Sequence, residues 1–151
     1  MNDAIIIASD HAGVEMKAAV VDELRRRGLP VTDAGPATAD SVDYPDYAAA
    51  VAGPVSGGAV PRGILICGSG IGMSIAANKF PGVRAGLCLT EEMAALSRRH
   101  NDANILVLPG RLIGVEEARR IVRAWLDTPF EGGRHQRRVD KIAALETRLK
   151  K

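Results

Sequence analysis

Short apolar runs rich in β-branched residues alternate with segments of helical periodicity along most of the chain. The runs predict strands at residues 4–8, 30–34, 63–67, 84–88 and 103–108, and the periodic segments predict helices at residues 14–27, 47–55, 71–79, 91–99 and 115–126. The first run, Ala4–Ala8, is apolar on both faces, which is typical of a buried parallel strand. Because alternating strands and helices form right-handed βαβ crossovers, the sequence predicts an α/β fold: a three-layer sandwich around a mostly parallel, five-stranded, Rossmann-like sheet.

One more amphipathic segment, residues 136–150, follows the last alternating unit. Its apolar residues include Val139, Ile142, Ala143 and Leu145. We expect an extra C-terminal helix that packs on a neighbour such as a second subunit. The chain has 151 residues, the usual size of one domain, and no linker-like stretch divides it. We therefore expect a single domain over residues 1–151.

Composition and charge exclude several classes of protein. The net charge is only +2, and five aromatic residues are too few for a stacking platform, so we expect no nucleic-acid partner. The charge is distributed unevenly along the chain, because residues 110–151 hold 11 Lys and Arg against 6 Asp and Glu. This basic C-terminal third is able to bind an anion. Two cysteines form no disulfide framework, and no apolar run is long enough for a membrane span, which favours a cytoplasmic protein without a membrane partner.

Polar residues stand at three places where this fold leads us to expect a ligand. Parallel α/β sheets bind ligands beyond the carboxyl ends of their strands. Asp10-His11 follows the first strand, and Cys67-Gly68-Ser69-Gly70-Ile71-Gly72 follows the third. The helix before the fifth strand ends in His100-Asn101-Asp102, and we expect this turn to face the same cleft.

The glycine-rich turn after the third strand is the most informative of the three. Gly68, Gly70 and Gly72 let the backbone come close to a ligand and present N–H groups that suit a phosphate or another oxyanion. The spacing G-x-G-x-G departs from the dinucleotide fingerprint G-x-G-x-x-G, and Lys79 lies too far on for a Walker motif. The alternative is a turn that needs glycine only for tight packing.

Cys67 and Cys88 both end apolar strands, but only Cys67 adjoins the glycines. At the start of that turn, a thiol faces the cleft and favours its reactive thiolate form. The alternative for Cys67 is a small buried apolar residue, and we assign Cys88 to that role. The three histidines, His11, His100 and His135, are able to act as acids, bases or anion ligands.

Arg134 and Arg138 stand four residues apart after Gly132-Gly133, so they share one face of a helix. Paired guanidinium groups suit a phosphate, and the alternative is an ordinary solvated basic surface. No group of His, Asp and Glu in the sequence has the spacing typical of metal ligands. The sequence therefore predicts neither a metal nor another cofactor.

Taken together, these motifs resemble the type B ribose-5-phosphate isomerases, which belong to a sugar-phosphate isomerase family with galactose-6-phosphate and allose-6-phosphate isomerases. The similarity runs over nearly the whole chain. It rests on Asp10-His11, the Cys67–Gly72 turn with residues 74–79, His100-Asn101-Asp102, Arg111, and Gly132-Gly133-Arg134-His135 with Arg138. The resemblance implies an aldose–ketose isomerase that interconverts ribose 5-phosphate and ribulose 5-phosphate through an enediolate, without a cofactor.

The resemblance also implies a role for each of these residues. Cys67 is the expected base that moves a proton between C1 and C2. The N–H groups of Gly68, Gly70, Ile71 and Gly72, with the Ser69 hydroxyl, are expected to hold the enediolate oxygens. His100, helped by Asp10, is expected to open the furanose ring. The expected contacts to the rest of the substrate are Asn101 with the sugar hydroxyls, and His11, Arg111, Arg134 and Arg138 with the phosphate.

Proteins of this kind are homodimers, sometimes tetramers, with active sites shared between subunits, which gives the C-terminal helix a purpose. Three alternatives remain open from the residues themselves. One is isomerisation of allose 6-phosphate, galactose 6-phosphate or a tetrose phosphate, and another is a non-catalytic module that binds a phosphate or a nucleotide. The third is a Cys–His acyl-transfer enzyme, which is disfavoured because no residue is evident that would orient a histidine base.

Overall fold

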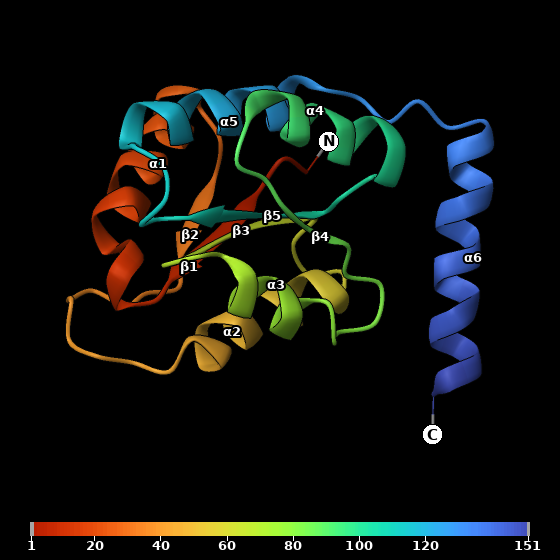
Figure 1. The fold of residues 1–151 in the computed structure, drawn as a ribbon, viewed down its shortest axis with the longest axis horizontal. Coiled ribbons are helices and arrows are strands. Elements are labelled where there is room, and N and C mark those ends of the chain that lie inside the picture. Colours follow the sequence, from red (N-terminus) through yellow and green to blue (C-terminus); the bar gives the residue numbers. More distant parts are fainter. Residues whose placement is uncertain (1, 151) are drawn as a thin grey trace.

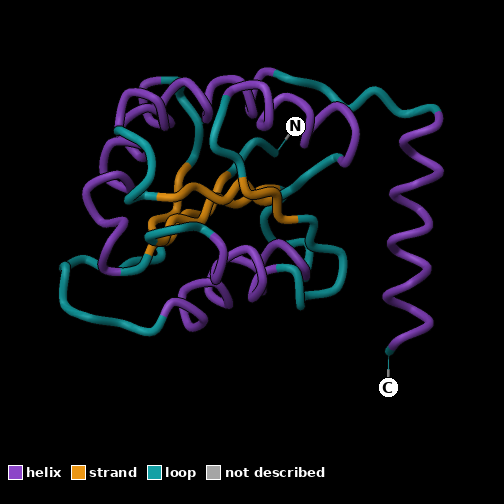
Figure 2. Tube along the Cα trace, viewed as in Figure 1, coloured by secondary structure: helices purple, strands orange, loops and turns teal. Residues whose placement is uncertain are grey.

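The computed structural model describes residues 2–150 and has three layers with one helix beside them (Figure 1, Figure 2). Five strands form one sheet in the order β2-β1-β3-β5-β4, and every neighbouring pair is parallel. The strands are β1 (Ile5–Ser9), β2 (Val31–Asp33), β3 (Arg62–Cys67), β4 (Ala85–Leu87) and β5 (Ile105–Pro109). The predicted α/β fold is confirmed, and the sheet is parallel throughout.

Helices connect the strands in the predicted order. They are η1 (His11–Gly13, a 3-10 turn), α1 (Val14–Arg26), α2 (Tyr44–Ser56), α3 (Ile71–Ala77), α4 (Glu91–Asn101), α5 (Val115–Asp127) and α6 (Arg134–Leu149). Most ends differ from the prediction by one or two residues. The largest difference is at α2, which begins three residues early because Pro45 is tolerated in the first turn of a helix.

Side chains of each strand alternate between the two faces of the sheet and build two separate cores. On one face, Ile7, Ile64 and Leu108 pack against α1, α4 and α5, with Trp125 fully buried among them. On the other face, residues such as Leu65 pack against α2 and α3. Every residue of β1 and β5 is buried, which explains why these strands are apolar on both sides.

The helix α6 stands apart from the sandwich. Figure 1 shows it alongside the sheet, and its one substantial contact among the described elements is with α4. Three large apolar residues of α6 stay exposed: Ile142 at 42%, Leu145 at 45% and Leu149 at 72%. No helix within residues 2–150 combines the length and apolar character needed to cross a membrane.

The sheet and α2 come close together at Gly63. A Cβ atom at this position would overlap Cγ1 of the fully buried Val51. We expect Gly63→Ala to lower the free energy of unfolding by about 1–3 kcal/mol through overpacking. Gly53→Ala, within α2, is the control, because a Cβ there meets no atom closer than 4.0 Å and alanine favours a helix, so this variant should not lower stability. Equal effects in urea denaturation would contradict this explanation.

Candidate active site

Cys67 ends β3 at the carboxyl edge of the sheet. It lies opposite Pro109 in the register, and its carbonyl oxygen accepts a hydrogen bond from the N–H of Gly110 at 2.8 Å. The thiol is free, and the residue is 5% exposed. The backbone around Cys67 is therefore fixed by both neighbouring strands and by the next loop, while its side chain stands at the point where the chain leaves the sheet.

The glycine turn that follows Cys67 depends on one left-handed residue. Gly70 has φ +77°, a conformation that favours glycine, and a side chain there would also overlap Leu87. The Ser69 hydroxyl accepts a hydrogen bond from the N–H of Ile71 at 3.2 Å. Because the first N–H groups of a helix have no acceptor within it, the turn presents donors beside the thiol.

The ring of Tyr44 packs against this turn at Gly72. A Cβ atom on Gly72 would lie 2.6 Å from Cζ of Tyr44, so the aromatic ring rests directly against the glycine backbone. Tyr44 is the first residue of α2 and is partly exposed. No sequence signal marks Tyr44 as a site residue, because its position is apparent only when α2 and α3 are packed together.

Asp10 and His11 extend the same edge from the end of β1. The N–H of Asp10 donates to the carbonyl of Ile66 at 3.0 Å, which ties this loop to β3. The Asp10 carboxylate accepts from the N–H of Ala12 at 2.9 Å. His11 accepts at Nδ1 from the N–H of Val42 at 3.2 Å, so Nε2 is the nitrogen left to donate to a ligand.

The loop that carries Val42 is fixed at its start by Lys17, a residue that sequence reasoning missed. Lys17 is 5% exposed at its side chain, and its Nζ donates to Oδ1 of Asp33 and to the carbonyl of Pro36, both at 2.7 Å. This half-buried ion pair, together with the bond to Pro36, links α1 to the end of β2 and the segment that follows. It thereby helps to hold the segment that fixes the ring of His11.

Arg111 lies at the carboxyl edge close to the glycine turn. Its N–H donates to the carbonyl of Gly68 at 2.9 Å, and a Cβ atom on Gly68 would lie 3.3 Å from Nη1 of Arg111. The guanidinium group therefore covers the first glycine of the turn. We define the carboxyl-edge cluster as Asp10, His11, Cys67, Gly68, Ser69, Gly70, Ile71, Gly72 and Arg111.

His100 and Asn101 do not join this cluster within one chain. They end α4, and Ile105 at the start of β5 pairs with Gly63 and Ala85, near the starts of β3 and β4. The expectation that the His100-Asn101-Asp102 turn faces the same cleft is therefore wrong for a single chain. A helix that precedes a parallel strand must return the chain to the amino edge, so its last residues lie at the opposite end of the sheet.

Arg134 and Arg138 lie with His100 near this amino edge. Both are exposed on the first turns of α6, which begins next to the end of α4. We define the amino-edge cluster as His100, Asn101, Arg134 and Arg138. Along β5, from Asn104 to Pro109, the two edges are roughly 16 Å apart at about 3.3 Å per residue. One sugar phosphate cannot contact both clusters of the same chain.

The sequence gives His135 only the general possibilities of an acid, a base or an anion ligand, and no specific role. Its ring stacks on that of His100 with 4.2 Å between the ring centroids and 12° between the planes. Ligand atoms of His100, Glu131 and His135 lie within 4.8 Å of one another. However, nearly parallel rings direct their nitrogen lone pairs side by side rather than toward one ion, so we describe the group as a histidine stack.

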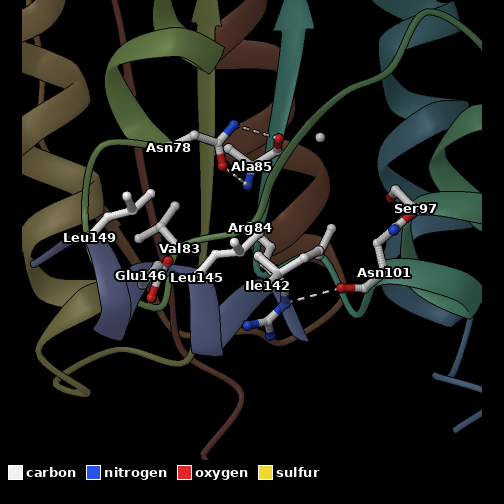
Figure 3. Close-up of a pocket in the computed structure, with 12 residues that line it drawn as sticks. Asn78, Val83, Arg84, Ala85, Ser97, Asn101, Ile142, Leu145, Glu146 and Leu149 are labelled. Atoms are coloured by element: carbon white, nitrogen blue, oxygen red, sulfur yellow. Dashed lines mark hydrogen bonds between the residues drawn. The ribbon is translucent and has the colours of Figure 1, made fainter. Parts of the chain in front are cut away.

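A cavity of about 430 Å³ separates α6 from the sandwich (Figure 3). Apolar side chains line much of it, with Ile142 and Leu145 of α6 on one side and Val83 on the other. Figure 3 also shows that Nε of Arg84 donates to the carbonyl of Asn101, at 3.0 Å. Cys67 is not part of this lining, so the cavity is distinct from the carboxyl-edge cluster.

Three comparisons identify similar proteins. The sequence pattern of the family described as Ribose/Galactose Isomerase matches residues 5–142. Ribose-5-phosphate isomerase B of Escherichia coli is 50% identical over 144 residues, which cover 95% of this chain and 97% of that protein. A putative sugar phosphate isomerase of Bacillus subtilis is 48% identical over 143 residues, covering 94% of this chain and 96% of that protein.

Solved structures agree with the sequence comparisons. The ribose 5-phosphate isomerase of Thermotoga maritima has a TM-score of 0.92 and 53% identity, covering 95% of this chain and 99% of that one. Ribose-5-phosphate isomerase B from Mycoplasma genitalium, crystallised with bound ribulose-5-phosphate, has a TM-score of 0.92 and 44% identity. That match covers 95% of this chain and 96% of the Mycoplasma chain.

The histidine stack makes stability depend on pH. Burial, followed by the charges of His100 and Arg134, lowers the pKa of His135 from its ordinary value of 6.5. As the pH falls, the His135 ring therefore gains a proton at a higher pH in the unfolded chain than in the folded chain. The free energy of unfolding is highest above pH 6.5 and decreases as the pH falls below it. We expect the free energy of unfolding to drop more between pH 7.5 and 5.5 for the natural protein than for His135→Phe. Parallel losses in urea titrations would contradict the assignment.

Proposed function

The chain belongs to the ribose/galactose isomerase family and is a sugar-phosphate isomerase, and we propose that it interconverts ribose 5-phosphate and ribulose 5-phosphate. The observation that carries the proposal is the Mycoplasma structure with bound ribulose-5-phosphate, which matches nearly the full length of both chains. The carboxyl-edge cluster supplies a thiol, a row of N–H donors and an arginine, which are the groups that this chemistry needs.

Ring opening is the first step that we assign. The bond between C1 and the ring oxygen O4 breaks, O4 gains a proton, and the hydroxyl on C1 loses one to leave an aldehyde. We assign this proton exchange to His100 with the help of Asp10. Asp10 suits the role because its carboxylate is buried and held by the N–H of Ala12, which fixes the direction of its free oxygen.

Proton transfer between carbons is the second step. The Cys67 thiolate takes the proton from C2, which gives an enediolate, and the proton then returns to C1 while the O2 hydroxyl proton moves to O1. The N–H groups of the glycine turn and the Ser69 hydroxyl lie next to the thiol and suit the oxygens on which negative charge develops. Asn101 is assigned to the sugar hydroxyls, and His11, Arg111, Arg134 and Arg138 to the phosphate.

Two copies of the chain are needed for a complete site in this proposal. The two clusters lie at opposite edges of one sheet, so the amino-edge cluster of a second copy must face the carboxyl-edge cluster of the first. The exposed apolar residues Ile142, Leu145 and Leu149 give α6 a surface for such a partner. We propose a homodimer with shared sites, which is able to pair further into a tetramer.

We also propose a single catalytic domain that works in the cytoplasm. The five strands of the described residues form one sheet, and Cys67 lies at the end of one of them. A short connection after α5 joins α6 to this sandwich. Cys67 and Cys88 are both free, and a catalytic thiol remains reduced in a reducing compartment.

Replacing the proposed base tests the reaction. We expect Cys67→Ala to lower kcat for ribose 5-phosphate by about 10²–10⁴-fold, the usual range for loss of a general base. Cys88→Ala is the matched control and should retain activity, because burial raises the pKa of the Cys88 thiol to about 11. NMR should show solvent deuterium entering C1 of ribulose 5-phosphate with the natural protein and with Cys88→Ala, but not with Cys67→Ala. Full activity of Cys67→Ala would exclude the thiolate base, and higher kcat/KM for allose, galactose or erythrose phosphates would reassign the substrate.

Mixing two inactive variants tests the shared site. Cys67→Ala and His100→Ala each disable one cluster, and a mixed dimer holds one site with both natural residues if sites are shared. After equal amounts are unfolded, mixed and refolded, we expect about one quarter of the natural activity, since half of the dimers are mixed and each has one intact site of two. A site within one chain would give no recovery.

A further inference from the structure

His135 contacts a residue of the proposed reaction without belonging to either cluster. Its ring covers one face of the His100 ring, with centroids 4.2 Å apart, and the residue is 5% exposed. We propose that His135 is a positioning residue that holds the His100 imidazole in the orientation needed for ring opening. This inference rests on the proposed role of His100 and adds a residue to it.

The connection between α5 and α6 fixes the position of His135 against His100. Gly132 and Gly133 have φ values of +68° and +56°, which turn the chain sharply before α6 begins. The N–H of Glu131 donates to the carbonyl of Arg99 at 3.1 Å, directly beside His100. The N–H of His135 donates to the carbonyl of Gly132 at 3.0 Å. The turn is thus bound to the end of α4, and the ring of His135 has a defined place.

The surroundings of His135 favour its neutral form. Burial lowers its pKa, and His100, Arg134 and Arg138 act in the same direction. Only the Glu131 carboxylate, 3.6 Å from Nε2, opposes them. A neutral ring adds no positive charge beside His100, which must exchange a proton with the sugar. The stack therefore restrains the orientation of His100 without competing for protons near pH 7.

A purely structural role for the stack is the competing explanation. The stack lies where α6 meets α4, so it also helps to attach α6 to the sandwich. Loss of a structural contact would impair every step of the reaction together. Loss of a positioning contact would impair only the step that His100 performs, and the two steps are separable by the choice of substrate.

Ribulose 5-phosphate provides that separation because its C5 oxygen is phosphorylated and it stays open-chain. Exchange of its C1 hydrogen with solvent deuterium requires the enediolate step but no ring opening. For His135→Leu we expect kcat for ribose 5-phosphate to fall about tenfold or more, since small misplacements of catalytic groups have effects of this size. Exchange into ribulose 5-phosphate should stay within about twofold of the natural protein.

His135→Phe is the matched variant, because it keeps a flat ring without the nitrogens. It should recover most of the ring-opening activity that His135→Leu loses. His135→Gln, which also lacks a ring, replaces the leucine variant if that protein fails to fold or to dimerise. The inference is overturned if both reactions fall together, if neither changes, or if the phenylalanine and non-aromatic variants behave alike. A natural protein with neither activity would instead reject the proposed function.

Discussion

The common direction of the five strands is the constraint on which the rest of the structure depends. Because the sheet is parallel throughout, each helix must carry the chain from the carboxyl edge back to the amino edge. Residues that follow strands, such as Cys67 and Arg111, therefore gather at one edge. Residues that end helices, such as His100, gather at the other. The division of the candidate site into two clusters is a consequence of this topology, and no change of side-chain conformation within one chain can remove it.

Much of the fold could be predicted because its signals are local. The β-branched runs mark the strands, and the common direction of those strands is enough to place Asp10 and Cys67 at one edge. The same rule places His100, at the end of a helix, at the opposite edge, so the expectation of one cleft for all three motifs was wrong for a single chain. Strand order and the contacts of Tyr44 and His135 could not be predicted. These depend on packing between elements far apart in sequence, which leaves no periodic pattern.

The arginines near the amino edge differ in what their donors bind, and this difference separates them into two groups. Arg84 and Arg98 donate hydrogen bonds to carbonyl groups of their own chain. Nη2 of Arg84 donates to the carbonyl of Asp102 at 2.9 Å, and Nη1 of Arg98 donates to the carbonyl of Ala103 at 2.6 Å. These contacts satisfy carbonyl groups at the end of α4. Arg134 and Arg138 are exposed on α6 instead, so their guanidinium groups stay available to an anion. Counting charges along the sequence does not distinguish these two groups.

The position of α6 connects assembly with one particular step of the proposed reaction. The stack of His100 and His135 attaches the helix to its own sandwich near its start. Near its end, Glu146 accepts a hydrogen bond from the N–H of Gly82 at 2.9 Å. A partner that packs on the apolar side of α6 therefore also restrains the histidine stack. The Cys67 turn, in contrast, is held by strands of its own sheet. In the proposed homodimer, association should thus complete the groups for ring opening and phosphate binding, whereas the geometry of the thiol and its N–H donors is already formed in each copy.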